Sequence, residues 1–154
     1  MKKFCLGLTL IELLVVMAIT ALIAGGGLAA YNSFNKGQAV KAVASDLKNN
    51  LRLAQGKASA QEKPTGCSCL SGYQVVINSP SYSIQAFCHV ENPAPADNPC
   101  GSSQSFSVPA NVSLSPNTTV KFWSLTGGTT PAAITVSGFG RSALVNVTKT
   151  GEIY

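Results

Sequence analysis

Residues 8–30 read LTLIELLVVMAITALIAGGGLAA, and this stretch decides the organisation of the chain. Glu12 is the only ionisable side chain among its 23 residues. An α-helix rises about 1.5 Å per residue and needs about 20 apolar residues to cross the hydrocarbon core of a bilayer. The stretch is therefore long enough to span a membrane once. Because Lys2 and Lys3 precede it, the positive-inside rule predicts a cytoplasmic N-terminus, with everything after residue 30 outside.

Two simpler interpretations of this stretch remain open. A secretory signal peptide also begins with lysines, and Leu28-Ala29-Ala30 offers small residues for cleavage. Signal peptides, however, have an apolar region of about 7–15 residues without a carboxylate. A plain signal anchor explains the span but gives no role to Glu12. A carboxylate in hydrocarbon costs about 2.5–3.5 kcal/mol, so Glu12 needs a cationic partner. Cleavage after Gly7 would create one, the α-amino group of Leu8.

The residues around this point resemble a known processing signal. Lys2-Lys3-Phe4-Cys5-Leu6-Gly7, followed by the apolar run from Leu8 to Val16, resembles the class III signal of type IV pilins and type II secretion pseudopilins. The resemblance implies that a prepilin peptidase cuts after Gly7 and methylates the new N-terminus at Leu8, where the family usually has Phe. It also implies that Glu12 pairs with the N-terminal amine of a neighbouring subunit. The implied partners are other pilin or pseudopilin subunits, the peptidase and an inner-membrane assembly platform.

The resemblance also gives a domain plan. It comprises a leader (1–7), a membrane or filament-core helix (8–30), an amphipathic helix (31–63) and a β-rich domain (64–154). Gly25-Gly26-Gly27 interrupts the first helix, since each Gly costs about 1 kcal/mol relative to Ala. The run is either a weak point that stretches in a filament or a site of close helix packing.

Residues 31–61 are predicted to continue as a helix. Their apolar positions recur every three or four residues, which is one helical stripe: Val40, Val43, Leu47, Leu51, Ala54 and Ala58. Charged residues occupy the other faces, so the stripe should pack on a sheet. Pro64 disfavours helical conformation in the residue before it and predicts the stop.

Beyond residue 66 the apolar period changes to two. Tyr73 to Ile77 and Tyr82 to Cys88 alternate around Asn78-Ser79-Pro80-Ser81, which predicts a hairpin whose paired residue numbers add up to 159. Further strands are expected at 105–108, 111–114, 120–125, 133–136 and 143–148. The predicted fold is α+β, with a long helix packed on an antiparallel sheet domain. This part resembles the minor pseudopilins of the H type and the minor pilins of DNA uptake.

Four cysteines remain once Cys5 is removed with the leader: Cys67, Cys69, Cys88 and Cys100. An even number in an oxidising compartment predicts two disulfides. Cys67 and Cys69 are expected on one extended strand, which makes them poor partners for each other. The hairpin register favours Cys69 with Cys88 and Cys67 with Cys100. A zinc site that includes His89 is the alternative, but only one residue separates the first two cysteines, whereas structural zinc sites favour two to four.

The sequence contains no recognisable catalytic motif. His89 is the only histidine, and neighbouring strand residues point to opposite faces, so Cys88 and His89 do not form a nucleophile and base pair. We expect no enzyme activity, no cofactor and no metal, with His89 in a surface loop beside Glu91. Three sequons, at Asn111, Asn117 and Asn146, carry no weight because the pattern is common by chance.

The net charge of the chain is +5, and removal of Lys2 and Lys3 leaves 9 basic and 6 acidic residues, a net charge of +3. The excess lies mostly on the predicted helix 31–63. Three functions remain: a structural subunit of a pilus or secretion filament, a DNA-binding minor pilin, and a plain membrane-tethered domain. Lys121, Arg141 and Lys149 are the candidate DNA contacts, since cationic loops bind nucleic acid electrostatically. Glu152 follows Gly151 where some uptake pilins have arginine, which weakens the DNA interpretation.

Overall fold

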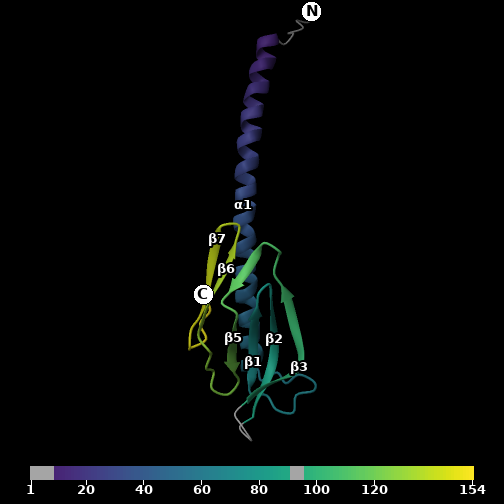
Figure 1. The fold of residues 1–154 in the computed structure, drawn as a ribbon, viewed down its shortest axis with the longest axis vertical. Coiled ribbons are helices and arrows are strands. Elements are labelled where there is room, and N and C mark those ends of the chain that lie inside the picture. Colours follow the sequence, from purple (N-terminus) through teal and green to yellow (C-terminus); the bar gives the residue numbers. More distant parts are fainter. Residues whose placement is uncertain (1–8, 91–95) are drawn as a thin grey trace, which may run out of the picture. The chain divides into compact units, whose positions relative to one another are not determined.

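The structure, a computed structural model, describes residues 9–90 and 96–154. The chain forms two compact units, Met1–Lys36 and Gly37–Tyr154. One helix, α1 (Leu10–Ser59), contributes to both units (Figure 1). The helix continues through all three glycines at 25–27.

The helix ends at Ser59, two residues earlier than predicted. Gln61 adopts a positive φ of 52°, and the Glu62 N–H donates to the Lys57 carbonyl at 3.1 Å. This pattern is typical of a helix C-terminus closed by a left-handed residue. The stop therefore comes from the backbone turn at Gln61 and not from Pro64.

Seven strands follow, arranged in two antiparallel sheets. The four-stranded sheet has the order β3-β2-β1-β5, and the three-stranded sheet has the order β4-β6-β7. The bounds are β1 Gly72–Asn78, β2 Ser81–Val90, β3 Ala96–Ser107, β4 Val112–Ser115, β5 Thr118–Trp123, β6 Ala132–Gly138 and β7 Arg141–Val147. The α+β prediction is confirmed.

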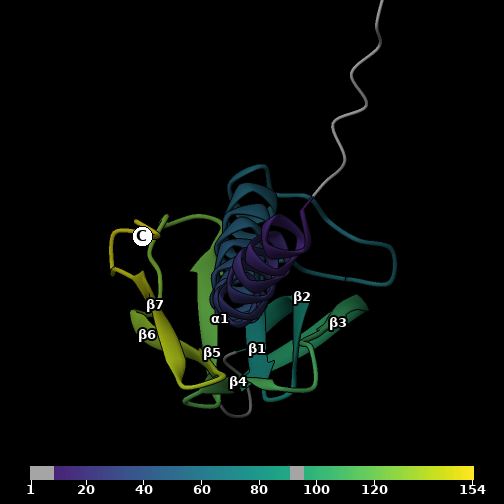
Figure 2. The ribbon, with the colours of Figure 1, turned by 90° about the horizontal axis from the view of Figure 1, so that it is seen from above.

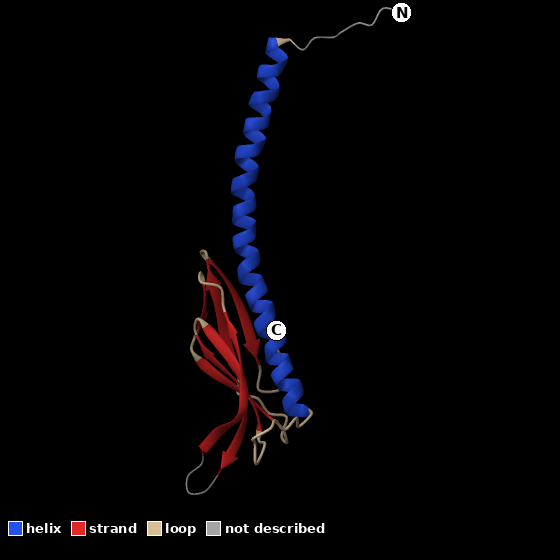
Figure 3. Cartoon of the chain, turned by 90° about the vertical axis from the view of Figure 1, so that its right-hand side faces the viewer, coloured by secondary structure: helices blue, strands red, loops and turns tan. Residues whose placement is uncertain are grey.

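The second part of α1, residues 37–59, lies against one face of the sheets (Figures 2 and 3). All six residues of the predicted stripe are buried, and Leu47, Leu51 and Ala54 are fully enclosed. They pack in one core with the inward residues of both sheets, among them Val75, Ile134 and Val145. The helical period of 3.6 and the strand period of 2 thus meet in a single hydrophobic core.

The hairpin of β1 and β2 has the predicted register, from Gly72 opposite Phe87 to Asn78 opposite Ser81. The predicted strand at 105–108 is instead the end of a much longer strand, β3, which begins at Ala96 and pairs with β2 through a bulge. The hairpin of β6 and β7 turns through Phe139 and Gly140, both with positive φ, which is typical of a two-residue type I′ turn.

Candidate assembly and anchoring site

The first part of α1, residues 10–36, exposes nearly all of its described apolar side chains. The large exposed apolar residues are Leu10, Ile11, Leu13, Leu14, Val15, Val16, Met17, Ile19, Leu22, Ile23, Leu28, Tyr31 and Phe34. By length and composition this helix can cross a membrane, and its most apolar window has no residue buried inside the chain. An apolar surface of this extent in water is unfavourable. It fits a single membrane crossing.

The helix begins with a capping interaction. The Glu12 N–H donates to the Thr9 carbonyl at 3.1 Å and lies 3.4 Å from the Thr9 Oγ1. Thr9-Leu10-Ile11-Glu12 has the spacing of a capping box. The sequence interpretation missed Thr9, although the Thr-x-x-Glu spacing was a sufficient signal. The cap satisfies backbone N–H groups that water could not reach in a membrane.

Glu12 has no cationic side chain against it among residues 9–90 and 96–154. Its side chain is exposed and lies in the first turn of α1. The processing residues Gly7 and Leu8 lie outside the described residues. Glu12 therefore presents its carboxylate near the start of an apolar helix, where a cation from outside the described chain could reach it.

Thr20, Gly25 and Gly26 are further polar and small residues of this part of α1. The Thr20 hydroxyl donates to backbone carbonyls one turn before it, at 2.9 Å to Val16 and 3.0 Å to Met17. A Cβ added at Gly25 or Gly26 would meet no atom within 4 Å. Among the residues that the structure describes, no packing contact therefore requires a glycine at 25 or 26, and both interpretations of the glycine run stay predictions.

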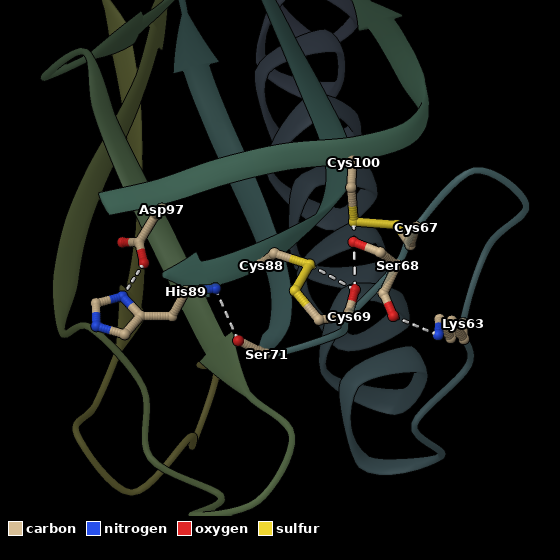
Figure 4. The surroundings of a disulfide bond; sticks show 9 residues. All are labelled: Lys63, Cys67, Ser68, Cys69, Ser71, Cys88, His89, Asp97 and Cys100. Atoms are coloured by element: carbon tan, nitrogen blue, oxygen red, sulfur yellow. Dashed lines mark hydrogen bonds and ion pairs between the residues drawn. A yellow bond between two sulfur atoms is a disulfide. The ribbon is translucent and has the colours of Figure 1, made fainter. Parts of the chain in front are cut away.

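The four cysteines lie together at the end of the domain that holds the start of β1 (Figure 4). Cys67 bonds to Cys100 and Cys69 to Cys88, with Cα–Cα distances of 5.1 and 5.5 Å. This is the pairing that the sequence favours. The expectation that Cys67 and Cys69 lie on one extended strand is wrong, because both residues lie in a loop before β1. The loop leaves Cys67 buried and Cys69 exposed.

His89 was wrongly placed in a surface loop. His89 lies on β2, and its ring Nδ1 is 2.6 Å from Asp97 Oδ1 on β3. The backbone N–H of His89 donates to Ser71 Oγ at 2.8 Å (Figure 4). Lys121 on β5 binds the other Asp97 oxygen. Burial would raise the pKa of Asp97, but the hydrogen bonds from Lys121 and His89 outweigh burial and lower this pKa below its ordinary value.

This charged cluster covers an aromatic pair. Phe87, which is fully buried, meets Trp123 edge to face at 5.0 Å between ring centroids, and His89 contacts the same indole at 5.8 Å. Both aromatic residues lie opposite Gly72 in the sheet. The cluster therefore ties β2, β3 and β5 together across β1. The His89 ring lies between the Asp97 carboxylate and the Trp123 indole.

A zinc site receives no support from this geometry. Within the described ranges no group of three or more His, Cys, Asp or Glu residues could hold a metal ion. The four cysteines of the described residues are joined in disulfides and cannot act as thiolate ligands.

The three candidate DNA contacts do not form one patch. Lys121 is paired with Asp97. Arg141, at the start of β7, lies against Gly37 of α1, where a Cβ would come within 3.3 Å of the arginine Cδ. Lys149 is exposed in the turn after β7. Since β7 has seven residues and a strand rises about 3.3 Å per residue, its two ends lie about 20 Å apart.

Comparison with known families agrees with the N-terminal geometry. Residues 2–28 match the family described as "Prokaryotic N-terminal methylation motif". No curated protein and no solved structure matches the chain. The matched residues contain Gly7, Leu8 and Glu12 and most of the exposed apolar part of α1. The motif and the helix together support a type IV pilin-like structural subunit with one membrane-spanning helix.

Proposed function

We propose that the chain is a minor subunit of a type IV pilus or a type II secretion pseudopilus. A prepilin peptidase removes residues 1–7 and methylates Leu8. The processed subunit is anchored in the inner membrane with its C-terminal domain outside. It enters the filament through the first part of α1. The observation that supports this proposal most directly is that the matched motif coincides with the start of α1, whose most apolar window has no residue buried inside the chain.

Glu12 supplies the specific assembly contact in this proposal. In the described residues its carboxylate has no cation, and the amine at Leu8 of a neighbouring subunit would provide one. A paired carboxylate in a low-dielectric surrounding is far less costly than an isolated one. The same pairing would select the axial position of each incoming subunit.

The assignment to the minor group rests on the order of elements. A long helix is followed by antiparallel strands, and glycines stand at several strand ends, including Gly138 and Gly140 around the β6–β7 turn. The domain limits follow the same plan: leader 1–7, core helix 8–30, amphipathic segment 31–63 and β-rich domain 64–154. In this plan the globular domain has an interaction role and no catalytic one.

Processing provides the first test. The chain is coexpressed with a prepilin peptidase, and the intact mass of the membrane-extracted product is measured. The expected product begins at Leu8 and carries one added methyl group. Gly7→Val should leave the full-length mass, while the matched change Gly25→Val, inside the span, should not prevent cleavage. Cleavage near Ala30 would contradict the proposal and favour a secretory signal peptide.

A further inference from the structure

One edge of β7 faces away from β6. The Asn146 N–H donates to the Tyr154 carbonyl at 2.9 Å, and the Tyr154 N–H donates back at 3.1 Å. Asn146 therefore directs both backbone groups away from β6, and backbone groups along a strand alternate in direction. Leu144 and Ser142, two and four residues earlier, must direct their N–H and C=O groups to the same outer edge.

The C-terminal tail, Gly151–Tyr154, occupies part of this edge and shows how it binds an extended peptide. Two side chains of α1 hold the tail from the other side. Arg52 Nη2 donates to the Ile153 carbonyl at 3.1 Å, and Gln55 Nε2 donates to the Gly151 carbonyl at 3.0 Å. The tail is thus bound by the β7 backbone on one side and by helix side chains on the other.

The rest of the edge is empty. Neither Ser142 nor Leu144 has a backbone partner on this side within the described part of the chain. Both residues are exposed, and the Leu144 side chain is 53% exposed. Unpaired edges with accessible apolar side chains are templates for an added strand.

Two lysines of α1 lie beside this empty part of the β7 edge. Gly37 contacts Arg141 at the start of β7, and the two tail-binding residues lie farther along the helix. Helix positions 37, 41, 48, 52 and 55 recur at multiples of a turn and share one stripe. Lys41 and Lys48 therefore lie between the two contact points. Lys41 is exposed, Lys48 is half-buried, and neither makes an ion pair among the described residues.

We propose that the empty part of the β7 edge, together with Lys41 and Lys48, binds an extended acidic segment of a partner protein by strand addition. The Ser142 and Leu144 backbones would supply main-chain hydrogen bonds, and the two ammonium groups would select carboxylates on the added strand. A second copy of this chain fits less well, because it would bring the same lysines into the contact. This binding does not depend on filament assembly.

The first test uses the full-length chain in detergent micelles and a fluorescent synthetic peptide in which Glu alternates with Val. Fluorescence anisotropy should show saturable binding that weakens as salt is added, because exposed charge pairs are screened. The matched peptide with Lys in place of Glu should bind at least about tenfold more weakly, a loss of one to two charge contacts.

Substitutions at Leu144 separate backbone pairing from side-chain contact. Leu144→Pro removes an N–H that points to the free edge and leaves the ladder with β6 intact, as proline is tolerated on edge strands. It should weaken peptide binding at least about tenfold, whereas Leu144→Ala, which keeps the N–H, should weaken it less than about threefold. Lys41→Glu combined with Lys48→Glu should abolish binding, and Lys149→Glu should leave it unchanged.

Amide hydrogen exchange of the wild-type chain keeps the proposal testable if the proline variant does not fold. The acidic peptide should slow exchange at Leu144 and Ser142 and leave the amides of β4 unaffected. Absence of saturable binding, binding unaffected by Leu144→Pro, or protection elsewhere would overturn the proposal. Peptide-independent dimerisation that protects the same amides would assign the edge to a second copy instead.

Discussion

The two parts of α1 differ in where their apolar surface goes. In residues 10–36 the apolar side chains that the structure describes are exposed, whereas in residues 37–59 the apolar stripe is buried against the sheets. Both parts are continuous helix. The second part is stabilised by its own chain, because the domain supplies the surface on which it packs. The first part needs a partner from outside the chain, either lipid or the helices of neighbouring subunits.

Removal of the Glu12 carboxylate tests the first part of this comparison and should have the largest effect. Glu12→Ala should be processed and inserted normally, because the change lowers the cost of insertion. Its recovery in sheared filaments should fall at least about tenfold, because removing one partner of a buried ion pair costs about 3–5 kcal/mol by leaving the other charge unpaired. The measurement is immunoblotting of sheared filaments and of membranes.

Thr20→Ala is the matched control for this experiment, since Thr20 is polar but satisfies its hydroxyl within the helix. It should enter filaments as the wild type does. A Glu12→Ala subunit present in filaments at the wild-type level would falsify the pairing mechanism and favour a plain tethered domain.

Core truncation tests the second part. Leu51→Ala should lower the free energy of unfolding of the domain by about 2–5 kcal/mol, because Leu51 is fully buried in the core. Leu53→Ala, two residues away and 42% exposed, should change it by less than about 0.5 kcal/mol. Urea denaturation of the full chain in detergent, followed by Trp123 fluorescence, measures both. Equal losses of unfolding free energy in the two variants would mean that the buried stripe does not stabilise the packing of α1 on the sheets.

Disulfide removal sharpens the comparison, since it should affect the domain and leave membrane insertion unchanged. The Cys67–Cys100 and Cys69–Cys88 bonds close sequence separations of 33 and 19 residues. Loop-closure entropy predicts about 3–4 kcal/mol for each, with about 0.5 kcal/mol more for the longer loop. Paired Cys→Ser variants in urea denaturation test the order. Non-reducing peptide mapping that finds other pairs would show the connectivity to be wrong.

The smallest expected effect belongs to Asp97. Asp97→Asn should lower the free energy of unfolding at neutral pH by about 1.5–3 kcal/mol, the range for hydrogen bonds to a charged group. Because the folded pKa of Asp97 is lowered, its ionised form stabilises the domain above the ordinary carboxyl pKa. This contribution is lost as the pH falls through the lowered value. The two proteins should therefore converge in acid, and a difference that is constant with pH would contradict this account.

Much of the fold could be predicted because the decisive signals are local. The stripe from Val40 to Ala58 and the alternation in β1 and β2 are written in consecutive residues. The first half of β3 was missed because Asn98, Pro99 and Gly101 have low strand propensity, and only pairing with β2 makes this segment a strand. Context of this kind is not visible along the chain.

The candidate site divides in the same way. Glu12 was recognisable as a lone carboxylate in an apolar run, and Thr9 could have been recognised from its spacing to Glu12. The contacts of Asp97 with His89 and Lys121 could not be predicted in this way. They depend on the register of β3 beyond a bulge and on the pairing of β1 with β5. The mutual approach of Arg141 and Gly37 likewise depends on the packing of β7 beside α1.

The placement of the disulfides has a consequence for the order in which the domain loosens. Both bonds cross-link the segment from Cys67 to Cys100, which includes β1, β2 and the start of β3. The sheet of β4, β6 and β7 has no covalent bond to the rest beyond the chain itself. Cooperative units of a protein open at different free energies. Under heat or mechanical load the three-stranded sheet should therefore open first, while the cross-linked sheet still holds the second part of α1.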